Sequence, residues 1–216
     1  GGMCRIGKPT STFGPYNGFG GYLDNFKSIK DYQENVIIDK PAVHLPLETN
    51  ATNIGFTPLT INSVGSPTYT TVDGKKCIKF ESGKYLTINN NNIFNLGTNS
   101  DFYMEADIYV LSNNSIQGII SATHTSSGAN NAILYINSNG KIYFRTGNNT
   151  NPLYTISSNI ININEWQNIK LFRKNDILTI ELNGIQTSSS DIHNIDFSLS
   201  STVIGLYTTI TSYFLN

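Results

Sequence analysis

The feature that most constrains the fold is a run at residues 101–110 in which side chains of two kinds alternate. One set is apolar and the other is acidic or aromatic: Phe102, Met104, Ala106 and Ile108 against Tyr103, Glu105, Asp107 and Tyr109. A period of two residues is that of a β-strand with one face in a core. Helical periodicity is nearly absent from the chain, so the sequence predicts an all-β protein.

Short turns separate the other strand-like segments. Segments 132–136 and 141–145 flank a turn that closes with Asn139-Gly140, and segments 166–172 and 177–182 flank the polar residues 173–176. Asn183-Gly184 turns the chain once more. Asn-Gly between strands is a strong hairpin signal. Many short strands joined in this way predict a two-sheet antiparallel β-sandwich or jelly roll.

One sequence pattern occurs near both ends of the chain. Arg5-Ile6-Gly7 and Val203-Ile204-Gly205 each end a strand-like segment and precede a Thr- or Ser-rich stretch. Only the first copy continues into the strand Gly21–Lys27. A segment that recurs in this way is typical of an array of similar units.

The repeat divides the chain into two parts. Residues 1–36 are predicted to be a last-strand hairpin that resembles the end of a preceding repeat, and residues 37–216 form the sandwich. Because the sandwich would otherwise lack one strand, we expect Gly21–Lys27 to complete it, through a linker at 31–43 that could span roughly 40 Å. Exchange of this strand between molecules is the competing outcome.

Charge and hydropathy exclude several classes of partner. The formal net charge is -1 and only 13% of residues are charged. A chain without a strong field is not expected to bind nucleic acid or an anionic membrane. No stretch of 18 apolar residues occurs, so membrane insertion is not expected either.

An ordered series of segments resembles a known family. The series is 44–48, 80–86, 101–109, 165–169, 178–184 and 204–205, with 21–26 as the last strand. It is similar to the laminin-G-like, concanavalin A-like jelly-roll domains of phage tail fibres and bacterial adhesins. The resemblance covers about residues 37–216, with 4–30 as the tail of the same pattern. It implies two antiparallel sheets of six or seven strands each.

Exposed tyrosines beside amide-rich loops predict a carbohydrate-binding surface. Tyr103, Tyr109, Tyr143 and Tyr154 have the outward phase on their strands, and Asn149 lies in a neighbouring loop with Asn148 and Asn151. Sugars have apolar faces and many hydroxyl groups, which suit tyrosine rings and amides. The alternative is that these tyrosines cover the sheet or contact another domain.

The resemblance also implies a possible structural Ca²⁺ ion. Many relatives hold Ca²⁺ between an N-terminal loop and an acid in the last strand. Asp24 matches that acid, and Asn53 stands in the loop where relatives often have Asp. An Asn carbonyl can bind Ca²⁺ with one negative charge fewer. The alternative is that Asp24 accepts hydrogen bonds from turn amides.

Catalysis is not expected. Glu105 and Asp107 lie two residues apart on one face of a strand, as a glycosidase acid and nucleophile could. Related concanavalin A-like glucanases carry a third carboxylate where this chain has Val110. No other nucleophile, phosphate-binding or metal-ligand motif is present. A glycan hydrolase therefore remains the least favoured alternative.

Three residues receive packing or backbone roles. Trp166, the only tryptophan, is predicted to pack in the core. Gly184 is predicted to supply a positive φ in its turn, and Gly205 a close approach between segments.

The sequence as a whole predicts a non-enzymatic binding or display module of a phage tail or adhesin-type protein. Its expected partners are surface polysaccharide or another cell-surface receptor, and neighbouring domains of the same polypeptide. Its expected location is the virion tail or the bacterial cell surface. A structural spacer without a ligand is the main alternative.

Overall fold

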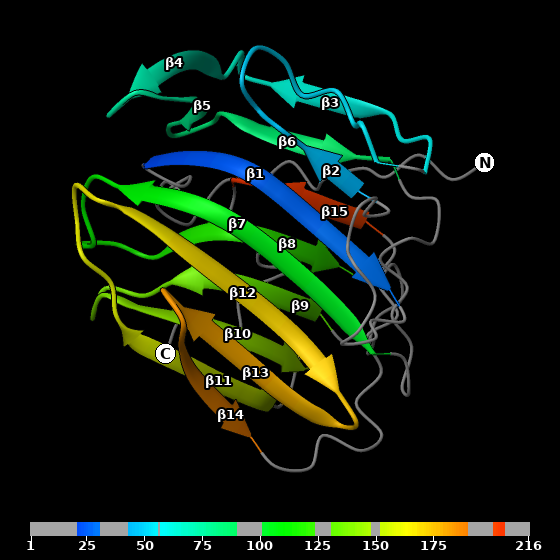
Figure 1. Cartoon of the computed structure of the whole chain (residues 1–216), viewed down its shortest axis with the longest axis vertical. Coiled ribbons are helices and arrows are strands. Elements are labelled where there is room, and N and C mark those ends of the chain that lie inside the picture. The colour runs from blue at the N-terminus through cyan, green and yellow to red at the C-terminus, as the bar shows by residue number, and fades with distance from the viewer. Residues whose placement is uncertain are drawn as a thin grey trace, which may run out of the picture.

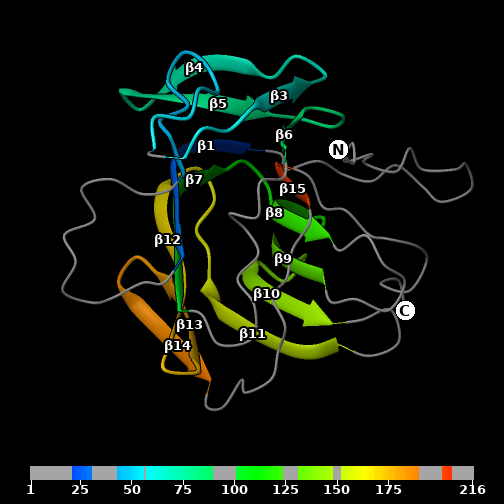
Figure 2. The same ribbon diagram turned by 90° about the vertical axis from the view of Figure 1, so that its right-hand side faces the viewer.

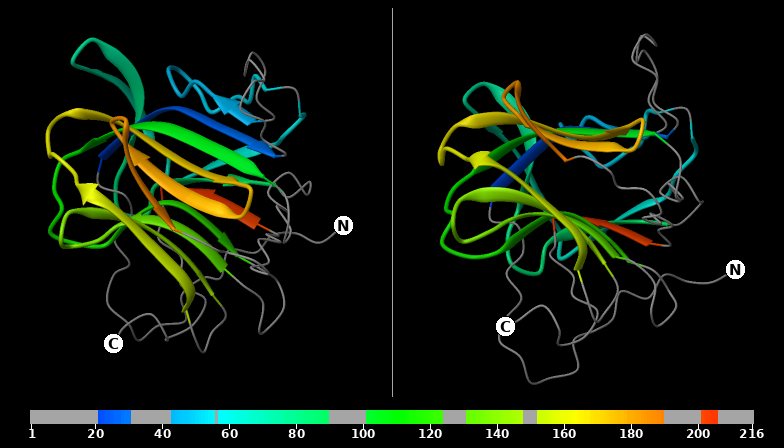
Figure 3. Two further views of the ribbon diagram at one scale, coloured as in Figure 1. Left: turned by 60° about the horizontal axis from the view of Figure 1, so that its bottom comes forward. Right: turned by 90° about the horizontal axis from the view of Figure 1, so that it is seen from below.

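The protein is a sandwich of two antiparallel β-sheets. The computed structural model describes residues 21–30, 43–55, 57–89, 101–123, 131–147, 152–189 and 201–205. Within these ranges the chain forms fifteen strands and no α-helix. The two sheets face each other as layers (Figure 2; Figure 3, right). The predicted fold class is therefore confirmed.

The first sheet has eight strands, one more than the six or seven that the resemblance implies. Figure 1 labels them. In spatial order they are β14 (Ile185–Ser189), β13 (Ile177–Leu182), β12 (Trp166–Lys174), β7 (Phe102–Val110), β1 (Gly21–Lys30), β5 (Lys75–Phe80) and β4 (Thr68–Val72), with β2 (Val43–Leu45) beside β1. β1 is the first of the described strands in sequence order, yet it lies in the middle of this sheet. It pairs with β7 on one side and with β5 and β2 on the other.

The second sheet has seven strands, in agreement with the implied six or seven. In spatial order they are β11 (Pro152–Ile160), β10 (Lys141–Gly147), β9 (Asn131–Ile136), β8 (Gln117–Thr123), β15 (Ser201–Ile204), β6 (Tyr85–Ile88) and β3 (Ile61–Val64). No helix long and apolar enough to cross a membrane occurs in the part of the chain that the structure describes.

The core lies between the two sheets. The apolar set of β7 faces it: Phe102, Met104, Ala106 and Ile108 are all buried there, as the alternation predicted. The predicted hairpins are confirmed as well. Asn183 and Gly184 join β13 to β14 with φ of 50° and 82°, the positive values that a two-residue hairpin turn requires.

Strand β1 contains a bulge that adjusts its side chains to the core. Leu23 and Phe26 are both buried in the core, although they are three positions apart in the sequence. In a regular strand they would face opposite sides. The pairing with β7 shifts between Asp24 and Lys27, and Asn25 has a φ of 51°. The extra residue restores the phase, so that both apolar side chains point inward.

The division of the chain into a 1–36 hairpin and a 37–216 sandwich stays a prediction. Residues 1–20, which hold the first copy of the repeat, lie outside the described residues. The structure does show that the strand within 21–30 belongs to the same sheet as the strands of the sandwich.

Candidate functional site

The outer face of the first sheet, turned away from the second sheet, carries a row of three aromatic side chains. Trp166 on β12, Tyr109 on β7 and Tyr22 on β1 are register partners across adjacent strands. The ring centroids of Trp166 and Tyr109 are 5.6 Å apart, and so are those of Tyr109 and Tyr22. Both pairs meet edge to face, which is a favourable geometry for aromatic rings. All three side chains are half-buried, so part of each ring reaches solvent. We call this set the aromatic row.

A second row of polar side chains runs beside the first. Asn168 on β12, Asp107 on β7 and Asp24 on β1 are register partners in the same three strands. Lys75 on β5 joins them: its Nζ lies 2.5 Å from Asp107 Oδ2 and 3.3 Å from Asp24 Oδ2. We call these four residues the polar row. It offers amide, ammonium and carboxylate groups next to aromatic rings, a combination that suits a ligand with hydroxyl groups.

Lys75 connects the two rows. Its ammonium group lies 4.8 Å from the centroid of the Trp166 ring, a cation–π distance. The Trp166 Nε1 donates a hydrogen bond of 3.1 Å to the Val72 carbonyl, in the strand that leads into Lys75. The hairpin of β4 and β5 is thereby tied to the aromatic row.

The carboxylates of the polar row differ in their electrostatics. Burial raises the pKa of Asp24, and the nearby Asp107 adds to this, although Lys75 opposes it. Burial lowers the pKa of Lys75, but its bonds to Asp107 and Asp24 outweigh this effect, so the pKa is raised. The Lys75 ammonium is closer to Asp107 than to Asp24, so the charge of Asp24 is the less compensated by Lys75.

Glu105 and Asp107 are held together by one amide group. Asn168 Nδ2 donates to Glu105 Oε1 at 3.0 Å and to Asp107 Oδ1 at 2.8 Å. Glu105 Oε2 also accepts a hydrogen bond from the Tyr103 hydroxyl at 3.0 Å. Each carboxylate is thus bound by groups of the protein itself. The two acids are therefore part of a hydrogen-bond network of side chains, and this arrangement gives no support to a role as the acid and nucleophile of a glycosidase.

The predicted tyrosine surface needs correction, because the structure divides the four tyrosines between two sheets. Tyr103 and Tyr109 belong to β7 in the first sheet, whereas Tyr143 lies on β10 and Tyr154 on β11 in the second. The outer faces of a sandwich point in opposite directions, so the four cannot form one surface. Sequence alternation gives the face of a strand but not the sheet to which it belongs.

The four tyrosines also differ in their surroundings. Tyr103 is only 8% exposed, and its ring stacks on Phe172 at 6.4 Å. Tyr143 stacks on Tyr135 at 5.6 Å, and its hydroxyl accepts a hydrogen bond from Asn139 Nδ2 at 2.8 Å. Tyr154 is the register partner of Thr146. Asn149 lies outside the described residues.

Sequence reasoning missed four members of the site: Tyr22, Trp166, Lys75 and Asn168. The prediction of Trp166 as a core residue is wrong, because β12 buries Ile169 and Leu171 on the core face and Trp166 has the opposite phase. The alternation of β12, counted back from Ile169 and Leu171, places Trp166 on the outer face and could have identified it as a surface residue. Tyr22 alternates with the buried Leu23 in the same way. Lys75 had no such signal, since its contacts come from distant parts of the chain.

The two residues predicted to bind Ca²⁺ have other partners in the structure. Asn53 Oδ1 accepts hydrogen bonds from the backbone N–H of His44 at 2.8 Å and of Gly55 at 3.0 Å. Asp24 faces the ammonium of Lys75. Asn53 Oδ1 and Asp24 Oδ2 thus have partners within the protein, which a bound Ca²⁺ ion would have to displace. In the described ranges no group of three or more His, Cys, Asp or Glu residues is placed to hold a metal.

Calcium binding at Asp24 and Asn53 therefore stays a prediction, with a direct test. If the ion binds, it stabilises the folded state by mass action, so Tm rises with calcium and falls with a chelator. Asp24→Ala should then remove the difference between the two conditions. Identical melting curves of the unchanged protein with calcium and with chelator would show that no such site exists.

His44 gives the strand pair β1–β2 a dependence on pH. Its Nε2 lies 2.9 Å from Asn25 Oδ1, and Lys27 is its cross-strand partner. Burial lowers the pKa of His44, and the charge of Lys27 lowers it further. The folded state therefore prefers the neutral imidazole.

The free energy of unfolding is expected to fall in mild acid because of His44. The unfolded chain takes up a proton near the ordinary pKa of about 6.5, before the folded protein does. The contribution is thus complete above that pH and is lost as the pH falls toward the folded pKa. Urea unfolding of the unchanged protein and of His44→Gln across this range measures it. A pH dependence that is unchanged in His44→Gln would assign the effect to other groups.

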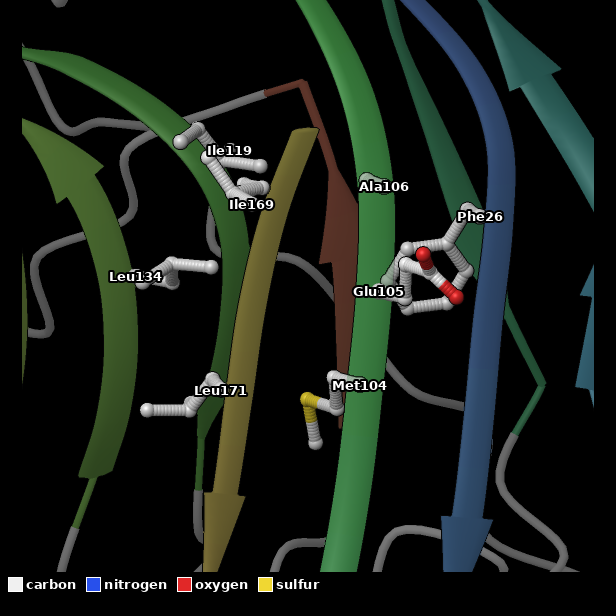
Figure 4. Close-up of a pocket in the computed structure, with 8 residues that line it drawn as sticks. All are labelled: Phe26, Met104, Glu105, Ala106, Ile119, Leu134, Ile169 and Leu171. Carbon is white, nitrogen blue, oxygen red and sulfur yellow. The ribbon is translucent and has the colours of Figure 1, made fainter. Parts of the chain in front are cut away.

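One internal void between the sheets is too small for a ligand. Figure 4 shows it between the sheets, lined by Phe26, Met104, Glu105, Ala106, Ile119, Leu134, Ile169 and Leu171. Its volume is about 10 Å³, close to the minimum for one water molecule, and its lining is almost wholly apolar. A sugar ring cannot enter it, which directs attention to the outer faces of the sheets.

A sandwich of two antiparallel sheets with this strand order is of the jelly-roll class. The sequence agrees: residues 80–208 match the laminin G group of the concanavalin A-like lectin/glucanases superfamily. The matched region is more than half of the chain, so the protein belongs to this superfamily. A comparison with curated protein sequences finds no match.

Solved structures share the fold. The receptor binding domain of the botulinum neurotoxin C/D mosaic serotype is similar with a TM-score of 0.57 at 14% identity, over 89% of this chain and 44% of that one. The binding domain of botulinum neurotoxin serotype D is similar with a TM-score of 0.57 at 16% identity, over 87% of this chain and 45% of that one. This chain thus spans less than half of either toxin domain. A likeness to the enzymatically active domain of tailspike protein 2 of bacteriophage CBA120 has a TM-score of 0.49, too low to show a shared fold.

Proposed function

We propose that the protein is a non-enzymatic binding module that recognises a surface polysaccharide through the outer face of the first sheet. The observation that carries the proposal is the aromatic row of Trp166, Tyr109 and Tyr22 beside the polar row. A sugar chain that lies along the aromatic row places apolar ring faces on the aromatic side chains. Its hydroxyl groups then face Asn168, Asp107 and Lys75, which can donate or accept hydrogen bonds.

The location and the parent protein belong to the same proposal. Modules of this kind act at a virion tail or at a bacterial cell surface, where polysaccharide is present and neighbouring domains of the same polypeptide supply further copies. The receptor-binding role of the neurotoxin domains is a reason to test binding, while their likeness to this chain concerns the fold alone. A single module should bind weakly, with avidity supplied by several copies.

Binding to a glycan array by a multivalent display of the protein tests the proposal. Tyr109→Ala removes the middle ring of the aromatic row, and we expect the affinity of each site to fall about two- to thirteenfold, because an aromatic contact contributes roughly 0.5–1.5 kcal/mol. The loss should be larger in the multivalent display. Tyr143→Ala, on the outer face of the second sheet, is the matched control.

Three outcomes are distinguishable. Loss of binding in Tyr109→Ala alone supports a binding site on the outer face of the first sheet. Loss in Tyr143→Ala alone moves the site to the second sheet, near Tyr143, Tyr154 and Asn149. Signals at background on a broad array and on host cells, for the unchanged multivalent protein, favour a structural spacer without a ligand.

A further inference from the structure

The backbone of β1 fills a slot with partners on both sides. Residues 21–23 pair with residues 78–80 of β5, and residues 26–28 pair with β2. On the other side β1 pairs with β7 from Gly21↔Val110 to Lys30↔Phe102. We call this gap, bounded by β5, β2 and β7, the β1 slot. Without β1 it would present unpaired N–H and C=O groups on both edges.

Side chains make the slot selective for the sequence of β1. Leu23 and Phe26 enter the core and are 1% and 2% exposed. Both can do so only because Asn25 forms the bulge with a positive φ. On the outer face Asp24 pairs with Lys75, and Asn25 Oδ1 lies 2.9 Å from His44 Nε2. The slot thus fits the series Leu-Asp-Asn-Phe and would reject a regular strand.

None of these contacts depends on the connection between β1 and the rest of the chain. They join residues 21–30 to strands that begin at Val43 or later. The sequence also places β1 after Arg5-Ile6-Gly7, the copy of the Val203-Ile204-Gly205 pattern that ends the sandwich. On the predicted division of the chain, the strand lies between the end of one unit and the start of the next. The same series of contacts is available to it in another molecule.

We propose that the β1 slot also accepts the β1 strand of a second copy of this chain, so that neighbouring copies are linked by exchange of this strand. The linker of residues 31–42 favours closure within one molecule, with an effective concentration in the millimolar range. Exchange between molecules becomes more favourable when copies are held close together, as in an assembly. The exchanged contact is the one already seen within the chain, so no new interface is required.

A cross-linking experiment between two differently tagged preparations tests the proposal. Cys4→Ser and Cys77→Ala first remove the natural thiols from both. One preparation then carries Tyr22→Cys on β1 and the other carries Lys79→Cys on β5, at positions that are register partners on the outer face. The two are mixed in denaturant, refolded together over a range of concentrations, and oxidised with oxidised glutathione.

Strand exchange predicts a disulfide-linked pair of unlike tags whose yield rises with concentration. Its yield should exceed by about tenfold that of a control in which Lys76→Cys replaces Lys79→Cys, since the register partner of Tyr22 is Lys79, three positions from Lys76. A single chain with both Tyr22→Cys and Lys79→Cys should form the bond within itself, which verifies folding and register.

Changes at the bulge provide the second control. Asn25→Val in the donor strand should lower the intermolecular yield, because a β-branched residue avoids positive φ, whereas Asn25→Gly should retain it. If the doubly substituted chain closes on itself and the mixed preparations give no more product than the Lys76→Cys control at any concentration, the proposal is wrong.

Discussion

A protein that lacks residues 1–30 is expected to be recovered as unfolded or aggregated material. The deletion removes β1 from the middle of the first sheet, and with it the pairing to β7, β5 and β2. Leu23 and Phe26, both fully buried, leave the core. Truncation of such side chains to Ala costs about 2–5 kcal/mol each. A domain with a total stability of about 5–15 kcal/mol is not expected to tolerate both losses together with an open sheet.

Circular dichroism, size-exclusion chromatography and thermal unfolding of the 31–216 protein measure this outcome. Phe26→Ala in the chain of residues 1–216 is a less disruptive variant, which should remain folded with a lower Tm. Recovery of a well-folded 31–216 protein with the stability of the full chain would show that the N-terminal segment is only a remnant of a preceding unit.

Gly205→Ala is expected to destabilise the protein by about 2–5 kcal/mol, the sum of a strained backbone and a steric overlap. Gly205 has a φ of 85°, and a Cβ atom there would lie 2.6 Å from Cδ1 of the Phe80 ring. Phe80 is fully buried in the first sheet, while Gly205 follows β15 of the second. The predicted close approach at Gly205 is thus confirmed as a contact between the two layers, and a Cβ atom there would force the Phe80 ring or the backbone to shift.

Gly184→Ala is the matched control for this variant. Its φ of 82° is nearly the same, but nothing lies within 4 Å of a Cβ atom at that position. It should therefore show only the backbone cost, about 1–2 kcal/mol. Urea unfolding of the two variants separates the two effects. Equal losses of stability would mean that Phe80 adapts and that the overlap contributes nothing.

Local patterns were sufficient to predict most of the fold. The alternation at 101–110 gave the core face of β7 correctly, because a strand with one buried face repeats every two residues. Asn139-Gly140 and Asn183-Gly184 gave two hairpins, since few residues accept the positive φ of such turns. These features depend on neighbours in the sequence.

The candidate site could be predicted only in part, because it depends on distant partners. Tyr109 was found from its phase on β7, but its neighbours in the aromatic row come from β1 and β12, far away in the chain. No local pattern indicates that β7 and β10 lie in different sheets, which is why Tyr109 and Tyr143 were assigned to one surface. Lys75 reaches Asp107 through the placement of a hairpin, and this follows only from the assembled sheet.

The position of β1 has a consequence for the order of events during synthesis. The ribosome makes this strand before any of its partners, and the pairing with β7 can be completed only after residue 110 has emerged. At about 5–20 residues per second, the strand waits for roughly 5–20 s with Leu23 and Phe26 exposed to water. Chains that grow side by side on one messenger RNA are close together during this interval. The first partner that a nascent β1 meets can then be a still unfilled β1 slot in a longer neighbouring chain rather than its own.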